Sequence, residues 1–223
     1  MTKPDPTVHG RTRAELGFRP LTRADFPLLA RWFAAPHVAP WWREDPDPAA
    51  IAARYTPTLD GRDPTRVYLI LLNTRPVGFI QRYRLTDNPD WATTLQPAFI
   101  PATTTASYAD PPAAAGIDYL LGEPQLTGHG LGPVVIDRFT TATFTDYPEI
   151  DTVVVAVNQA NRRSWRALEK AGYHRVYTGP LESDDPSDTG INHIYLRPRH
   201  QPSTQPAPGT PAAPSPGQSA ACE

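Results

Sequence analysis

The chain has 223 residues, of which 39% are hydrophobic, and a formal net charge of −2 at pH 7. This composition supports one sizeable core, and the absence of clustered Lys and Arg argues against a nucleic-acid partner. The single cysteine, Cys222, rules out a disulfide within the chain, and no apolar run is long enough to span a bilayer. Since the first residues also lack the apolar stretch of a signal peptide, we expect a cytoplasmic protein with no membrane partner.

Proline is unusually frequent, with 28 residues, and many of them follow residue 200. Segments rich in Pro, Ala and Ser bury too little apolar surface to offset the entropy that ordering costs. We therefore predict disordered tails at residues 1–13 and 200–223 and one folded domain over residues 14–199.

The spacing of apolar residues predicts an α/β domain with a mixed sheet. A helix-start signature runs from Thr22 to Asp25, and Asp47 followed by Pro48 opens a second helix. The aromatic segment 37–42 reads as a rigid loop, and the segment 88–114, which has no clear period, reads as a lid or an insertion. In chain order, strands are predicted at 16–21, 67–73, 77–85, 116–121, 152–157, 173–178 and 192–196, and helices at 22–36, 48–59, 130–147 and 159–171, which gives β-α-α-β-β-β-α-β-α-β-β.

The segment with the clearest chemistry is the glycine-rich turn between the strand 116–121 and the helix that begins near Gly130. Glycines let the backbone approach a ligand, and the N–H groups at a helix N-terminus favour an anion. The Gly-Lys-Ser/Thr of a Walker loop is absent, and a dinucleotide fingerprint would open its domain rather than lie past its middle. Two interpretations remain: a connection without a ligand, or the pattern Gln/Arg-x-x-Gly-x-Gly/Ala, which stands here as Gln125-Leu126-Thr127-Gly128-His129-Gly130.

This last pattern resembles the CoA-pyrophosphate turn of the GNAT acyltransferase superfamily. A second segment, Asn158 to Tyr173 (NQANRRSWRALEKAGY), is similar to the GNAT region that lines the acetyl-pantetheine arm. The resemblance implies the GNAT acyl-CoA N-acyltransferase fold, acetyl-CoA as the cofactor and a small-molecule amine as the substrate of a monomer or homodimer. The cofactor-binding residues that it implies are Tyr119, Leu120, Leu121, Gln125, Thr127, Gly128, His129, Gly130, Leu131, Gly132 and Asn161.

Within the superfamily, the chain looks like the aminoglycoside 6'-N-acetyltransferase group, which implies an antibiotic-resistance activity. The likeness is carried by Trp41-Trp42, Gln81-Arg82-Tyr83, Gly116 to Leu121, the glycine-rich turn and Glu169 to Tyr173. Enzymes that acylate the lysine-derived amine of siderophores share much of this layout, so another amine acceptor is an alternative.

Acidic residues around the acceptor cleft of that family pair with the ammonium groups of the substrate. Asp118 matches the family aspartate before the CoA turn, and it is the predicted catalytic base. The predicted substrate-binding set is Trp41, Trp42, Asp90, Trp91, Asp118 and Asp188. Alternatively, Asp90 and Asp188 are solvated loop residues, and one of Trp41 and Trp42 belongs to the core. His129 reads as an exposed turn residue, and no spacing in the chain suggests a metal site.

Two positions depart from the family pattern. An aspartate that often follows the second buried strand is replaced here by Ala156, and a tyrosine proposed as a general acid is replaced by Leu168. Both losses weaken the aminoglycoside interpretation more than the acetyl-transfer one. They also leave open a GNAT-like scaffold that binds CoA without turnover.

Overall fold

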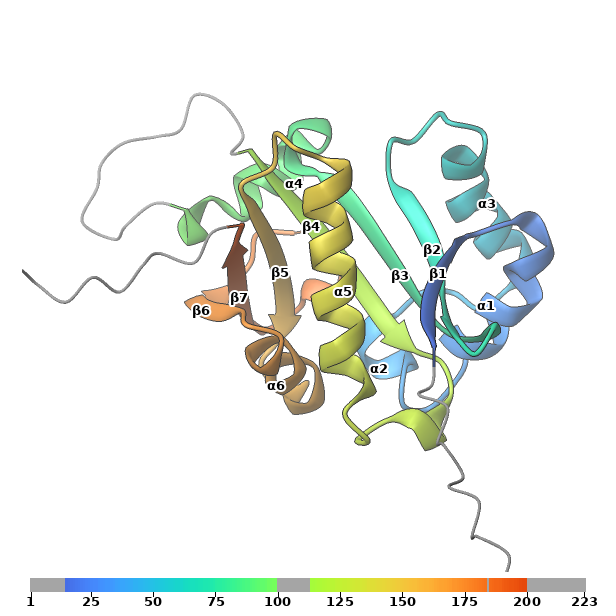
Figure 1. The fold of residues 1–223 in the computed structure, drawn as a ribbon. Helices are drawn as coiled ribbons and strands as arrows, with labels where there is room; N and C mark the ends of the chain where they lie inside the picture. Colours follow the sequence, from blue (N-terminus) through green and yellow to red (C-terminus); the bar gives the residue numbers. More distant parts are fainter. Residues whose placement is uncertain (1–14, 100–112, 184, 200–223) are drawn as a thin grey trace, which may run out of the picture.

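A seven-stranded sheet forms the centre of the structure, a computed structural model that describes residues 15–99, 113–183 and 185–199 (Figure 1). The strand order is β1-β2-β3-β4-β5-β7-β6; β4 and β5 pair in parallel, and the other neighbours are antiparallel. The mixed α/β sheet is therefore confirmed. The strands are β1 (Leu16–Pro20), β2 (Arg66–Leu72), β3 (Arg75–Arg84), β4 (Ala114–Leu121), β5 (Thr152–Asn158), β6 (His174–Pro180) and β7 (Ile191–Pro198).

Helices cover both faces of the sheet (Figure 1). One face packs against α5 (Leu131–Asp146) and α6 (Arg162–Lys170), in a core centred on Phe139 and Leu168. The other face packs against α1 (Phe26–Phe33) and α3 (Pro48–Leu59), around Trp32 and Phe79. The sheet thus separates two apolar layers, and a ligand that must contact both layers has to pass through it.

The residues that predict the starts of the first two helices cap those helices in the structure. Thr22 caps a short 3-10 turn, Arg23–Asp25, that leads into α1, and its N–H donates to the Asp25 carboxylate at 2.9 Å. Arg19 forms an ion pair with the same carboxylate at 2.8 Å, and it lowers the pKa of Asp25 to about 2. Asp47 caps α3 by accepting the N–H of Ala49 at 2.8 Å.

The structure differs from the predicted elements at two places. The aromatic segment predicted as a loop contains a one-turn helix, α2 (Ala39–Trp42), because Pro40 fits the first turn of a helix. The start of the segment predicted to lack a period forms α4 (Pro89–Thr94) and a 3-10 turn, Gln96–Ala98, whose few residues are too short for a periodic signal. The last residue of that predicted lid, Ala114, begins β4, whereas residues 100–112 and the predicted tails lie outside the described residues.

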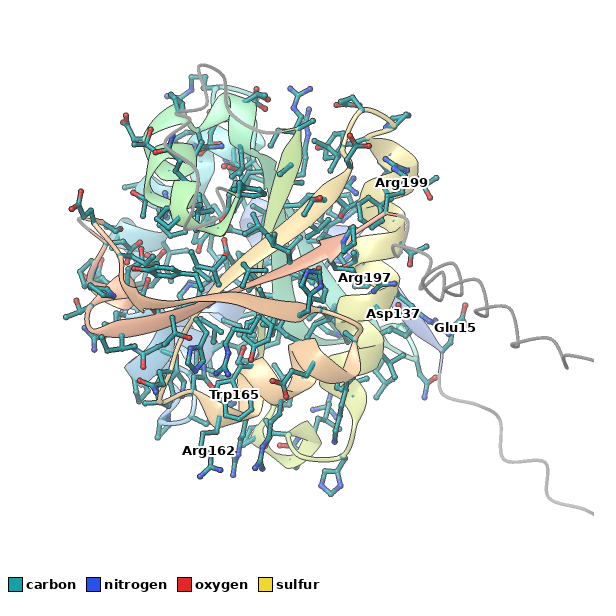
Figure 2. The ribbon with its side chains drawn as sticks, turned by 90° about the vertical axis from the view of Figure 1, so that its left-hand side faces the viewer. Glu15, Asp137, Arg162, Trp165, Arg197 and Arg199 are labelled. Carbon is teal, nitrogen blue, oxygen red and sulfur yellow. The ribbon has the colours of Figure 1, made fainter. Side chains whose placement is uncertain are left out.

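Two arginines contact α5: Arg199, just after β7, at the C-terminal end of the helix, and Arg197, on β7, near its middle (Figure 2). Arg199 donates to the carbonyls of Phe144 and Tyr147 at 2.8 Å each. Its positive charge is stabilising there, because the C-terminal end of a helix carries a partial negative charge. Arg197 forms an ion pair with Asp137 at 2.8 Å. These contacts fix α5 against the sheet, and with it the position of the opposite, N-terminal end.

The parallel pair β4 and β5 opens into a gap. Pairing covers only Ala114 to Gly116 on β4, and beyond Gly116 the two strands diverge toward their C-terminal ends, with α5 lying across the gap (Figure 1). Gly122 donates its N–H to Val77 on β3 at 2.9 Å, so alternation along the strand turns the N–H groups of Leu121 and Tyr119 toward the β5 side. The gap therefore offers backbone donors in the middle of the sheet.

Candidate active site

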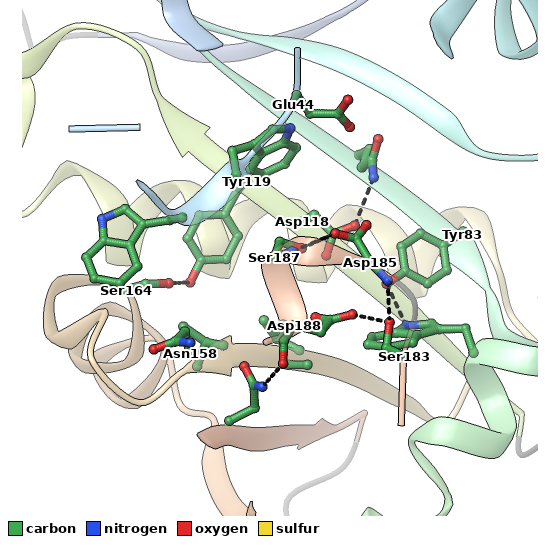
Figure 3. A pocket seen from close by; sticks show the side chains of 18 of the residues that line it. Glu44, Tyr83, Asp118, Tyr119, Asn158, Ser164, Ser183, Asp185, Ser187 and Asp188 are labelled. Atoms are coloured by element: carbon green, nitrogen blue, oxygen red, sulfur yellow. Dashed lines mark hydrogen bonds between the residues drawn. The ribbon is translucent and has the colours of Figure 1, made fainter. Parts of the chain in front are cut away.

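A cleft of about 320 Å³ lies at this gap (Figure 3). Its walls come from β3, β4, β5 and β7, from α2, α3, α4 and α6, and from connecting loops that include the one between β6 and β7. The lining residues are Trp41, Trp42, Glu44, Arg54, Asp63, Thr65, Gln81, Tyr83, Asn88, Trp91, Asp118, Tyr119, Val155, Ala156, Val157, Asn158, Asn161, Ser164, Ser183, Asp185, Ser187, Asp188 and Asn192.

Negative charge predominates in this lining. Five of the lining side chains are carboxylates, and one, Arg54, is a cation. Arg54 pairs with one of the five, Glu44, at 3.3 Å between Nε and Oε1, which leaves an excess of acidic groups for a bound ligand. A polyamine or another polycation complements such a surface, whereas an anionic acceptor does not.

Asp118 is the innermost acid of the cleft. Its carboxylate accepts a hydrogen bond from Gln81 Nε2 at 2.8 Å, and Gln81 faces it in register on β3. Burial raises the pKa of Asp118 to about 6, and the negative charge of Asp188 adds to the effect, while Gln81 and Arg54 oppose it. A carboxyl group with this pKa is ionised at neutral pH and is basic enough to accept a proton from an amine or a water.

The β6–β7 loop brings two further carboxylates to the cleft on the short turn Pro186–Asp188 (Figure 3). Ser183 donates to Asp188 at 2.7 Å, and burial raises the pKa of Asp188. Asp185 caps the turn by accepting from Ser187 N–H at 2.8 Å. This turn packs against β5, so its acids lie beside the strand on which Ala156 replaces the family aspartate.

Tyr119 enters the cleft from the opposite side of β4. Consecutive side chains of a strand point to opposite faces, and Tyr119 packs with the α5 and α6 layer while Asp118 faces Gln81 and α3. The Tyr119 hydroxyl lies 2.8 Å from Ser164 Oγ in the first turn of α6. The cleft therefore passes through the sheet, with an acid on one side and a hydroxyl pair on the other.

The glycine-rich turn ends at the N-terminus of α5, as predicted. Gly128 and Gly130 both have φ of +81°, and Gly130 is the N-cap of the helix. Within the described residues, the N–H groups of Gly128, His129 and Gly130 donate to no protein acceptor, and a Cβ on either glycine would meet open space. These exposed donors at the positive end of a 16-residue helix fit a pyrophosphate group.

The remaining cofactor positions lie around this turn and the gap. Thr127 donates to Pro124 O at 2.8 Å, Gln125 is exposed beside Glu123, and Asn161 caps α6 at Ser164 N–H. Leu120 points away from the α5 and α6 layer, and it packs in the core around Trp32 and Phe79. The resemblance placed Leu120 in the cofactor set with its neighbours, but strand alternation turns its side chain to the α1 and α3 side, and its N–H group faces β3.

Not all of the predicted substrate-binding residues meet in the cleft. Trp41, Trp42 and Trp91 line it, and Trp42 also stacks on Phe33 in the core. Asp90 is exposed in the first turn of α4 and is not among the lining side chains. Since a helix places consecutive residues about 100° apart, α4 presents Trp91 to the cleft and turns Asp90 to solvent.

Several lining residues were not predicted from the sequence. Arg54 lies on α3 and Glu44 in the segment before it, and their role in the cleft depends on how that helix packs on the sheet. Asp185 lies three positions before the predicted Asp188, and the run of acids in this loop was the available signal. Ser164 carried no signal at all, because serine is common in the first turn of helices.

Comparison with known proteins agrees with this geometry. The family model described as an acetyltransferase (GNAT) domain matches residues 22–181. The chain is 27% identical over 165 residues to the aminoglycoside N(6')-acetyltransferase type 1 of Klebsiella pneumoniae and, equally, to that of Serratia marcescens. Each match covers 72% of this chain and 74% of the relative.

Solved structures give the same result. The crystal structure of aminoglycoside acetyltransferase AAC(6')-Ib with coenzyme A superposes with a TM-score of 0.66 at 25% identity, covering 83% of this chain and 95% of that chain. An uncharacterised protein of Bacillus halodurans has the same fold, with a TM-score of 0.66 at 18% identity over 83% of this chain and 84% of that chain. From its family, its fold and its cleft, we conclude that the chain belongs to the GNAT family and is an acetyl-CoA-dependent N-acetyltransferase.

Proposed function

We propose that the acceptor is an aminoglycoside and that the enzyme acetylates its 6'-amino group, an activity of the antibiotic-resistance type. The observation that carries this proposal is the excess of carboxylates in the cleft, five acids against the one cation, Arg54. Aminoglycosides carry several ammonium groups on a rigid polar frame, so several acids at fixed positions would hold them. The relatives named above are aminoglycoside 6'-N-acetyltransferases, which supports the same choice.

Asp118 is the proposed base. An ammonium group is not a nucleophile, so the acceptor must lose a proton before it attacks the thioester carbonyl. The Asp118 carboxylate lies at the gap in the sheet, and Gln81 holds its Oδ2 in place at 2.8 Å. It would take the ammonium proton directly or through one water molecule. The backbone N–H groups of Tyr119 and Leu121 face the same gap and would polarise the thioester carbonyl.

Asp185 and Asp188 are proposed to bind the ammonium groups that do not react. Asp188 belongs to the turn that packs on β5, Asp185 caps that turn, and both line the same cleft as Ala156. Their position compensates for the aspartate that the family often carries at Ala156. The aromatic walls Trp41 and Trp91 would stack on the apolar faces of the sugar rings.

The acetyl donor is proposed to bind across the sheet from the acceptor. Its pyrophosphate would accept hydrogen bonds from Gly128, His129 and Gly130, and its arm would run along the gap past Asn161 to Tyr119. Gly132 faces Ala167 on α6. A Cβ added at Gly132 would lie 3.5 Å from the Ala167 Cβ, which is an ordinary van der Waals contact. The proposed path of the arm therefore runs beside two helices that pack against each other.

The proposal is tested by the initial rate of CoA-thiol release from acetyl-CoA with a panel of amines. The panel contains kanamycin-type aminoglycosides, lysine derivatives as siderophore-precursor mimics, and linear polyamines. We expect the highest kcat/KM with the aminoglycosides and a loss of at least about 100-fold in Asp118→Asn. A higher kcat/KM with a lysine derivative would replace the acceptor and keep the cofactor site. Binding of acetyl-CoA without turnover of any amine would favour a non-catalytic scaffold.

A further inference from the structure

The hydroxyl pair of Tyr119 and Ser164 bridges the gap in the sheet (Figure 3). Tyr119 belongs to β4 and Ser164 to the first turn of α6, and their oxygens are 2.8 Å apart. Both side chains are half-buried and line the cleft. The pair therefore lies at the opening in the sheet between β4 and β5.

The Tyr119 and Ser164 hydroxyls lie beside the path that we propose for acetyl-CoA. A pyrophosphate held by Gly128 to Gly130 lies on the α5 and α6 side, whereas Asp118 faces the other side. The thioester must reach from one side to the other through the gap, because β4 and β5 pair only up to Gly116. On this proposed path its carbon would meet the amine near Asp118, and its sulfur would lie on the side of Tyr119.

The hydroxyl of Tyr119 is a neutral donor at this point. Burial raises the pKa of Tyr119 above its usual value, the charges of Asp118 and Tyr195 act in the same direction, and the hydrogen bond with Ser164 opposes it. The group therefore keeps its proton over the whole physiological range. Tyr83, the other tyrosine of the cleft, lies on the Asp118 side, because it shares the strand face of Gln81.

We propose that the Tyr119 hydroxyl donates a hydrogen bond to the CoA sulfur as it leaves, and that Ser164 holds the hydroxyl in that orientation. The amine nitrogen forms its bond to the carbonyl carbon, the carbon–sulfur bond breaks, and its electron pair goes to sulfur. The protons lost by nitrogen pass to Asp118 and water. The thiolate hydrogen-bonded to Tyr119 then takes a proton from water, so Tyr119 itself ends unchanged.

This role supplies what the sequence lacks at Leu168. The tyrosine that the resemblance leads one to expect there is replaced by a leucine that is fully buried in the core. The side chain of Leu168 cannot form a hydrogen bond, whereas Tyr119 brings a tyrosine hydroxyl to the cleft from a different element. The inference rests on acetyl transfer and on the proposed donor path, and it does not depend on the identity of the acceptor.

The test uses Tyr119→Phe and a matched control, Tyr173→Phe. Tyr173 is also a buried tyrosine with a hydroxyl partner, Thr140 at 2.6 Å, but it does not line the cleft. The first readout is the pKa of the thiol of bound CoA, followed by the carbon NMR shift of the methylene group beside sulfur. We expect it to rise by about one unit in Tyr119→Phe and to stay at the wild-type value in the control.

The second readout is kinetic. In Tyr119→Phe we expect kcat to fall about ten-fold or more while the Kd of CoA stays within about two-fold of wild type. Ser164→Ala, which keeps the tyrosine, should show a smaller change in the same direction, and it serves if Tyr119→Phe fails to fold. An unchanged thiol pKa in both variants would overturn the proposal. Loss of CoA binding in Tyr119→Phe would also overturn it, because Tyr119 would then hold the donor rather than assist the leaving sulfur.

Discussion

Asp118 and Tyr119 are consecutive residues of β4, and their side chains reach the same cleft from opposite faces of the sheet. Asp118 accepts from Gln81 on one side, and Tyr119 shares a hydrogen bond with Ser164 on the other. The arrangement is possible because β5 leaves β4 after Gly116 and opens the sheet between them. One strand could thus contact both the proposed amine site and the proposed acyl-donor site, which lie on opposite sides of the sheet.

The pH dependence of turnover should report the ionisation of Asp118. Its pKa is raised by burial to about 6, and only the carboxylate can act as a base, so kcat/KM should rise with pH through about 6 before levelling. Initial rates of thiol release between pH 5 and 9, corrected for ionisation of the free amine, measure this. In Asp118→Asn the limb should be absent; a limb that persists there belongs to another group.

Two neighbours of Asp118 should move that limb in opposite directions. Gln81→Met removes a donor to the carboxylate, so the apparent pKa should rise; Asp188→Asn removes a negative charge, so it should fall. We expect shifts of about half a unit to one unit in the same assay. Equal shifts in the two variants would mean that the limb does not arise from Asp118.

Substitution of Gly130, the N-cap of α5, should weaken the binding of acetyl-CoA and leave the binding of the amine acceptor unchanged. Gly130→Ala forces a side chain into φ of +81° and tilts the N–H groups of the turn, so the Kd of acetyl-CoA should rise about ten-fold. Gly61→Ala is the matched control, since Gly61 has φ of +73° with open space around it, outside the turn. Calorimetric titration with acetyl-CoA compares the two; equal weakening would show that only lost stability is measured.

Much of this site was predictable from local sequence signals. Gly128 and Gly130 predict a turn with left-handed backbone before a helix, and Asp118 is recognisable as an acid in an apolar strand. Thr22 and Asp25 mark a helix start through groups that are adjacent in the chain. Such signals need no knowledge of tertiary structure, because the physical cause lies within a few residues.

Other parts of the site depend on packing between distant elements. The pair of Tyr119 and Ser164 joins residues 45 positions apart, and Gln81 meets Asp118, 37 positions away, only because β3 pairs with β4. Asp90 shows the opposite case: the family resemblance suggested a substrate-binding role, with a solvated residue as the alternative, and the one-residue phase of a short helix turns Trp91 to the cleft instead. Tertiary contacts decide which side of a short helix faces the cleft and which distant residues meet, so neither could be predicted from local sequence.

Removing the Asp118 carboxylate should stabilise the fold while it abolishes the base. In the folded state its pKa is raised from 3.8 to about 6, so ionisation opposes folding as pH rises through this range. Asp118→Asn should therefore be more stable than wild type at pH 8, by about 2 kcal/mol, and equally stable at pH 3. Urea unfolding at the two pH values measures the difference; a variant less stable at pH 8 would contradict the assigned pKa.

The most direct test of the proposed acceptor is the structure of the product. Purified protein is incubated with acetyl-CoA and a kanamycin-type aminoglycoside, and the product is analysed by mass spectrometry and two-dimensional NMR. The proposal predicts a single acetyl group on the 6' nitrogen, formed by wild type and not detectably by Asp118→Asn. Unmodified aminoglycoside, in a sample whose acetyl-CoA binding is intact and which acetylates a different amine, would contradict it.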